Sequence, residues 1–215
     1  KDAADMTDFA KIGRAWCLIV RAYGCMDLME TFAPAYMYGG AEAKGMRWYE
    51  KYSIGQETVD RDATGKITYD RIKDDLKEAV SLLTAAKVGY TVGTTADNED
   101  LDLGVANFLL ARAALWTGDW SVCISACDAI IKSGKYSFIP AANYGSVNTG
   151  TGIGDAAEFK PATNAFLNLK VNPEVILGYG DGSSYRTNQS ANASYFNSYA
   201  AGNPAARVND VLYNT

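Results

Sequence analysis

The chain has 215 residues, of which 48% are hydrophobic and 21% charged, a composition typical of a globular protein with one hydrophobic core. Its formal net charge is −5 and its basic residues are scattered, which excludes the basic stripe that nucleic-acid binding requires. The chain contains no histidine, so a Ser-His-Asp triad, a Cys-His dyad and a histidine metal site are excluded. No apolar run is long enough to predict a membrane-spanning helix.

The first predicted element is a long helix over residues 3–31. Two apolar stripes repeat along it at helical spacing, and a helix that is apolar on two sides is expected to be buried between neighbours. One stripe consists of Met6, Phe9, Gly13, Trp16, Cys17, Val20 and Gly24. The other consists of Ile12, Ala15, Ile19, Ala22, Met26 and Met29.

Residues 32–68 contain several glycines and aromatic residues and show no helical period. A loop of this length is usually functional or disordered, and its aromatic residues, among them Trp48 and Tyr49, argue against disorder. This segment is therefore predicted to be a functional loop.

Three further helices are predicted by their periodicity. The second has an apolar face that runs from Tyr69 to Leu83 and a charged face opposite it. The third covers residues 101–117 and the fourth residues 119–133, with Gly134 as the C-terminal stop. Small residues at helix contacts and a Gly-Asp-Trp corner between these two helices are typical of a tetratricopeptide hairpin. Because one hairpin cannot bury both its faces, the first two helices are expected to form an earlier pair.

The composition changes after Tyr136, where glycine, asparagine and serine become frequent and periodicity is lost. The one short apolar run, "NPEVILGYG" over residues 172–180, predicts a strand. The whole prediction is a mostly α-helical chain with a helical core over residues 3–136, a loop-rich region over 137–215, and few short strands.

The four cysteines lie in pairs on predicted helices, Cys17 with Cys25 and Cys123 with Cys127. Each spacing places the pair on one apolar face, where a free cysteine behaves as a small hydrophobic side chain. Buried thiols are the favoured interpretation, a disulfide is the second, and no metal-binding cysteine motif is present.

Aromatic residues are unusually frequent in the predicted loops. Flat rings stack on the apolar faces of sugars or on peptides, while neighbouring Asn, Arg and Asp side chains donate and accept hydrogen bonds. Each ring taken alone is better explained as an anchor of its own loop, but as a group these rings point to a ligand surface. They are Trp48, Tyr49, Tyr52, Tyr144, Tyr179, Tyr185, Tyr195, Phe196 and Tyr199.

Four segments resemble the SusD/RagB family in their order and pattern: "FAKIGRAWCLIVRAYGCMDLMETFAPAYMYG", "ITYDRIKDDLKEAVSLL", "FLLARAALWTGDWSVCISACDAIIKSGKYSF" and "NPEVILGY". The resemblance implies one SusD-like domain over residues 1–215, shorter than is usual in the family. It also implies a lipid-anchored protein on the outer membrane of a Bacteroidetes bacterium, with an anchor that this chain does not contain. Such proteins bind glycans or peptides and deliver them to a SusC-like, TonB-dependent transporter, without catalysis, metal or cofactor.

The ligand residues expected from this resemblance follow the Asn-x-Glu-x-Ile segment, and the chemistry of the long loop adds Trp48 and Tyr49. The residues after that segment are Tyr179, Asp181, Tyr185, Arg186, Asn188 and Tyr195. Two alternatives remain open. One is a tetratricopeptide-type scaffold that binds a partner protein on its helical face. The other is a truncated glycan-metabolising enzyme, with Asp155 and Glu158 as paired carboxylates.

Overall fold

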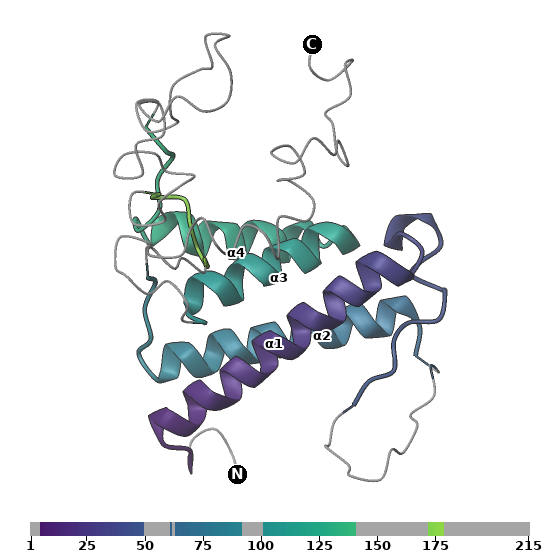
Figure 1. Cartoon of the computed structure of the whole chain (residues 1–215), viewed down its shortest axis with the longest axis horizontal. Helices are drawn as coiled ribbons and strands as arrows, with labels where there is room; N and C mark the ends of the chain where they lie inside the picture. Colours follow the sequence, from purple (N-terminus) through teal and green to yellow (C-terminus); the bar gives the residue numbers. More distant parts are fainter. Residues whose placement is uncertain (1–4, 50–60, 62, 92–100, 141–171, 179–215) are drawn as a thin grey trace, which may run out of the picture. The chain divides into compact units, whose positions relative to one another are not determined.

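A computed structural model describes residues 5–49, 61, 63–91, 101–140 and 172–178 of the chain (Figure 1). The chain divides into two compact units, residues 1–178 and 179–215, and the second lies entirely outside the described residues. Within the described part the regular structure is helical and contains no strand, which confirms the mostly α-helical class. The single SusD-like domain stays a prediction.

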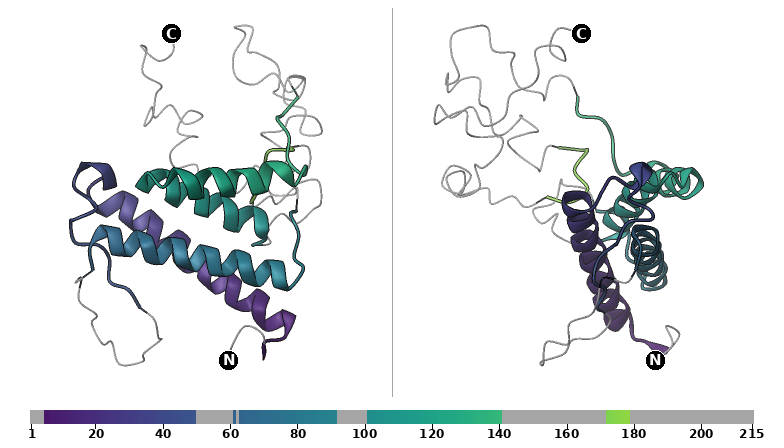
Figure 2. Two further views of the ribbon diagram at one scale, coloured as in Figure 1. Left: turned by 180° about the vertical axis from the view of Figure 1, so that it is seen from behind. Right: turned by 90° about the vertical axis from the view of Figure 1, so that its right-hand side faces the viewer.

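Four α-helices and one short 3₁₀ helix form the described part of the first unit. They are α1 (Asp8–Phe32), η2 (Tyr36–Tyr38), α2 (Gly65–Ala85), α3 (Leu103–Thr117) and α4 (Trp120–Lys132). Helix α1 packs on α2, α2 on α3, and α3 on α4, and α1 also contacts α3. Consecutive helices run antiparallel, as the views in Figures 1 and 2 show.

Side-chain caps explain where the first three helices begin. The Thr7 hydroxyl accepts a hydrogen bond from the Ala10 amide at 3.3 Å, and Thr64 accepts one from the Ile67 amide at 3.3 Å. Asp102 accepts one from the Val105 amide at 3.1 Å. Each cap satisfies an amide that has no partner within its helix. Because of its Thr64 cap, α2 begins four residues before the apolar face that the sequence indicated.

The core lies between α1, α2 and α3. The second stripe of α1 is buried with the single exception of Ile12, as predicted, and so is the predicted face of α2 apart from half-buried Val80. At the centre of α2, Ile72 and Leu76 are completely buried. Burial of such aliphatic side chains is the main favourable contribution to folding.

The prediction that both stripes of α1 are buried is wrong. In the first stripe the side chain of Phe9 is 89% exposed and that of Val20 is 59% exposed, and Trp16 and Cys17 are exposed as well. The physical reason is that α2 and α3, the helices that contact α1 in the described part, pack against its other face. The outward face of α1 is therefore an apolar surface without a helical neighbour among the described residues.

The four cysteines are all free thiols. Cys25, Cys123 and Cys127 are half-buried at the edge of the core, where burial raises the pKa of Cys25 and of Cys127. Cys17 belongs to the exposed stripe of α1, so the prediction of a buried thiol is wrong for this residue.

The predicted strand over residues 172–180 is also wrong as far as it is described, since residues 172–178 form a turn and bends. The Ser137 amide donates to the Pro173 carbonyl oxygen at 3.2 Å, and the Ile139 amide donates to the Glu174 carboxylate at 2.7 Å. A strand needs a continuous ladder of backbone hydrogen bonds, and these two contacts do not form one.

Hydrogen bonds connect the segment after α4 to the segment before α3. The Tyr136 hydroxyl donates to the Thr91 carbonyl oxygen at 3.0 Å, and the Thr91 amide donates to Asp102 at 2.5 Å. Burial raises the pKa of Tyr136, so its hydroxyl stays protonated and keeps donating. These bonds hold the segments before and after the α3–α4 pair against each other.

The corner between α3 and α4 depends on Gly118, whose φ of 73° lies in the left-handed region. We expect Gly118→Ala to lower the free energy of unfolding by about 1 kcal/mol, because a Cβ disfavours this conformation. The measurement is urea denaturation followed by circular dichroism. As a control, Gly13→Ala on the exposed side of α1, where an added Cβ meets no atom within 4 Å, should raise it by about 0.5–1 kcal/mol. If the two substitutions change the free energy of unfolding equally, the left-handed conformation of Gly118 does not disfavour a Cβ.

Candidate functional site

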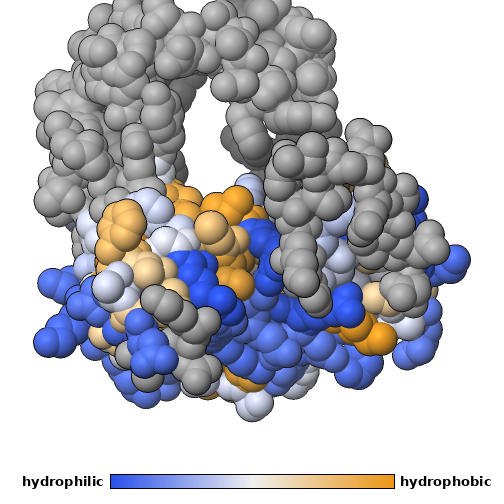
Figure 3. All heavy atoms as spheres, turned by 90° about the horizontal axis from the view of Figure 1, so that it is seen from below, coloured by the Kyte–Doolittle hydropathy of each residue, from blue (hydrophilic) through white to orange (hydrophobic). Residues whose placement is uncertain are grey.

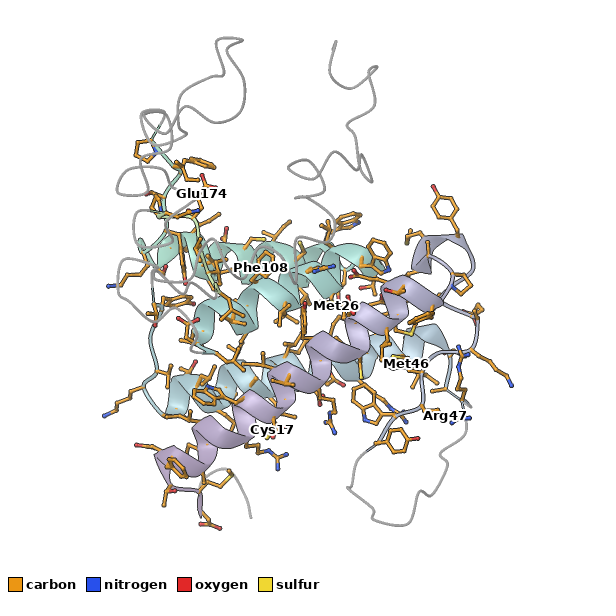
Figure 4. All side chains as sticks on the ribbon, in the orientation of Figure 1. Cys17, Met26, Met46, Arg47, Phe108 and Glu174 are labelled. Atoms are coloured by element: carbon orange, nitrogen blue, oxygen red, sulfur yellow. The ribbon has the colours of Figure 1, made fainter. Side chains whose placement is uncertain are left out.

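The loop after η2 is fixed against the beginning of α2. Hydrogen bonds join the Gly65 amide to the Ala43 carbonyl oxygen at 2.8 Å and the Gly45 amide to the Ala63 carbonyl oxygen at 2.7 Å. The Arg61 guanidinium donates to the Gly45 carbonyl oxygen at 2.7 Å. This network holds in place the segment that leads to Trp48, and Figure 4 labels Met46 and Arg47 on that segment.

A cleft of about 560 Å³ lies where this loop meets α1 and α2. Residues from all three elements line it, and its lining is rich in guanidinium groups. Cys17, labelled in Figure 4 on α1, contributes an exposed thiol. The lining consists of Arg14, Cys17, Leu18, Arg21, Trp48, Arg71, Asp74 and Asp75.

The indole of Trp48 forms the aromatic part of this cleft. Its side chain is only 8% exposed, and two guanidinium groups lie over its ring. The Cζ atom of Arg21 is 4.9 Å from the ring centroid and that of Arg71 is 5.7 Å from it. Such cation–π contacts orient a guanidinium without using its hydrogen-bond donors.

Two arginines of the cleft are paired with carboxylates of α2. Arg21 binds Asp75 through two nitrogens, each 2.7 Å from a carboxylate oxygen. Arg14 donates to Glu78 at 2.6 Å, and this hydrogen bond raises the pKa of Arg14. Arg21 also donates to the Tyr49 carbonyl oxygen at 3.4 Å. These contacts connect α1 to α2 and fix the orientation of both arginines.

Of the predicted ligand residues, Trp48 and Tyr49 lie in or beside the cleft. Trp48 is a buried wall covered by guanidinium groups, so it is not the open stacking surface that the sequence suggested. The Tyr49 side chain is 50% exposed, and its backbone is held by Arg21. The remaining predicted residues lie outside the described part of the chain: Tyr179, Asp181, Tyr185, Arg186, Asn188 and Tyr195.

Sequence reasoning missed the three arginines. Arg14, Leu18 and Arg21 recur at intervals of four and three residues, which places them on one face of a helix. The sequence therefore contained a signal that these residues share a face. It contained no signal for the approach of Arg71 to Trp48, because this contact joins a loop to a helix 23 residues further along the chain.

No group of three or more Cys, Asp and Glu side chains in the described ranges is arranged to hold a metal ion. Among the helices that the structure describes, none is long and apolar enough to cross a membrane. In the comparisons with known proteins, no protein-family model matched the chain and no curated protein matched it either.

Proposed function

We propose that this protein captures a glycan at the bacterial cell surface and passes it to a TonB-dependent outer-membrane transporter, with no bond broken. The proposal rests first on the four ordered sequence segments that resemble the SusD/RagB family. The lipid anchor and the SusC-like transporter partner belong to the same proposal. The structural observation that supports it most is the cleft between α1, α2 and the Trp48 segment.

The packing of the helices supports a tetratricopeptide-like arrangement. Helices α1 and α2 form one antiparallel pair, and α3 and α4 form a second. The first helices of the two pairs contact each other, and the second helix of the first pair contacts the first helix of the next. Stacked helical repeats bury their faces through contacts of this kind between neighbouring hairpins.

The size and the lining of the cleft support a role in sugar binding. A volume of about 560 Å³ lies within the usual range for small-ligand sites, about 300–1,000 Å³. Beside the cleft, next to Trp48 in the chain, half-exposed Tyr49 offers a ring for stacking on a sugar. The guanidinium groups of the lining offer donors for hydroxyl groups. Because the arginines are held by ion pairs and by the indole, little side-chain entropy needs to be lost on binding.

Tryptophan fluorescence provides the test, since Trp48 lines the cleft and the other three tryptophans do not. A variant with Trp16, Trp116 and Trp120 changed to phenylalanine leaves Trp48 as the only reporter. We expect a saturable change in its emission with one soluble polysaccharide of a panel, and a weaker affinity in Tyr49→Ala.

The control is Tyr38→Ala, which removes a well-exposed tyrosine of η2 outside the cleft and should leave the affinity unchanged. Tyr185→Ala tests the ligand residues predicted beyond the described part. If no polysaccharide or peptide in the panel changes the emission, the capture proposal is wrong.

A protein–protein scaffold is the second candidate, and the exposed apolar stripe of α1 favours it. Contiguous exposed apolar surface often marks a contact site, and Figure 3 shows apolar patches on a mostly hydrophilic face of the molecule. In this case Val20→Ser and Trp16→Ser on α1 should abolish binding of a partner, whereas Tyr49→Ala should not. Pull-down with both sets of variants separates the two functions.

A further inference from the structure

Arg71 differs from the other two arginines of the cleft in its partners. Arg14 and Arg21 are bound to carboxylates, whereas Arg71 has no carboxylate within ion-pair distance in the described part of the chain. Its described contact is the one with the Trp48 ring. The cleft therefore contains one guanidinium, that of Arg71, without an ion-pair partner among the described residues.

The carboxylates nearest to Arg71 on α2 are paired with other cations, which explains why Arg71 has no ion pair among the described residues. Carboxylates three and four residues further along a helix are the usual partners of an arginine, and here these residues are Asp74 and Asp75. Asp75 is bound to Arg21 through both oxygens, and Asp74 lies 3.7 Å from Lys77. The preceding residue, Asp70, binds Lys66 at 2.7 Å. All three nearby carboxylates of α2 are thus engaged by other cations.

The position of Arg71 over Trp48 leaves its donors available. A cation–π contact uses none of the N–H groups of a guanidinium, so these groups can still bind an anion through two parallel hydrogen bonds. The Arg71 residue is half-buried in contact with the buried indole, and partial removal from water strengthens the interaction of a cation with an anion. The guanidinium is accordingly oriented and partly desolvated before a ligand arrives.

We propose that the cleft selects acidic saccharides, and that Arg71 binds the carboxylate of a uronic acid or the sulfate ester of a sulfated sugar. Both groups present two or more coplanar or adjacent oxygens to a guanidinium, which is the shared chemistry of the two ligands. This inference rests on the proposed function, because it names the class of glycan that the cleft would capture.

Matched ligands test the charge directly. The chain of residues 1–215 is titrated by isothermal calorimetry with polygalacturonate and with its methyl ester, which has the same backbone without the charge. Dextran sulfate and dextran form the second pair. We expect the acidic member of at least one pair to bind about tenfold or more tightly than its neutral partner, and its affinity to fall as salt is added.

Substitution of Arg71 then locates the effect. Arg71→Gln should abolish the preference for the acidic member, and Arg71→Lys, which keeps the charge but cannot bind through two parallel hydrogen bonds, should retain part of it. Arg47→Gln removes an exposed arginine of the loop that does not line the cleft and should leave the preference unchanged. Circular dichroism checks that each variant is folded, and the salt dependence of the unsubstituted protein tests the charge without any variant.

Each outcome has one meaning. A preference for polygalacturonate supports the carboxylate form of the inference, and one for dextran sulfate supports the sulfate form. Equal binding of charged and neutral members, unaffected by Arg71→Gln, overturns the acidic class while glycan capture stands. Tighter binding of polyglutamate than of any polysaccharide overturns the saccharide class. If nothing in the panel binds, the proposed function fails and the inference fails with it.

Discussion

Ile72→Ala should lower the free energy of unfolding by about 2–5 kcal/mol, the largest effect expected from any single substitution considered for this chain. Ile72 is 0% exposed and lies in α2, which packs between α1 and α3. Truncation to alanine removes three carbon atoms from this contact and leaves a cavity that the helices can close only partly. Urea denaturation followed by circular dichroism at 222 nm, a wavelength at which helices give a strong negative signal, measures the loss.

The matched control is Ile67→Ala, the same substitution five residues nearer the start of α2. Ile67 is 44% exposed, so its truncation removes fewer contacts and should cost about 1 kcal/mol or less. Equal losses for the two variants would mean that α2 does not bury the face that contains Ile72. A change in the denaturant slope of only one variant would instead indicate a change in the unfolded state.

Gly65→Ala should lower the free energy of unfolding by about 2–3 kcal/mol, for a different reason. A Cβ added to Gly65 would overlap the carbonyl oxygen of Gly40, because the loop after η2 crosses the first turn of α2 there. Backbone atoms cannot move aside as the end of a side chain can, so the loop itself must shift. The expected loss is measured by urea denaturation of the variant.

Gly65→Ala should also change the environment of Trp48 in the cleft. The Gly65 amide binds the Ala43 carbonyl oxygen, so a shift here moves the segment that leads to Trp48. With Trp48 as the only tryptophan, we expect its emission to shift to longer wavelength in Gly65→Ala as water gains access to the ring. Gly89→Ala, where an added Cβ meets no atom within 4 Å, should change neither stability nor emission. An unchanged emission in Gly65→Ala would show that the loop and the cleft are independent.

The helices could be predicted because their signals are local. A capping residue lies directly before each of the first three helices, the apolar face of α2 repeats with helical period, and Gly134 with a φ of 64° follows α4 as expected. Periodicity, however, says only which residues share a face. Whether a neighbour covers that face is a tertiary property, and this is why the stripe of Phe9 and Val20 was wrongly expected to be buried.

The site was predictable only in part, again for a physical reason. Trp48 and Tyr49 were predicted as ligand residues because aromatic rings in a glycine-rich loop are unusual, and the structure places them in or beside the cleft. Their surroundings depend on residues distant in sequence. The indole is covered by Arg21 and Arg71, which come from two different helices. No sequence pattern within one segment predicts that both arginines contact the indole. The apolar run after Pro173 failed similarly, because a strand exists only when a second segment pairs with it.

The two faces of α2 separate what holds the molecule together from what a ligand would meet. Ile72 and Leu76 are committed to the core, whereas Arg71 and Asp74, on the adjoining positions, face the cleft. Substitutions at the latter pair change charge and hydrogen bonding without opening a cavity. If the cleft binds a ligand as proposed, substitutions at these positions change the ligand preference of the helix one residue at a time and leave the folded state nearly as stable as before. One scaffold with a common core would then be able to serve different ligands.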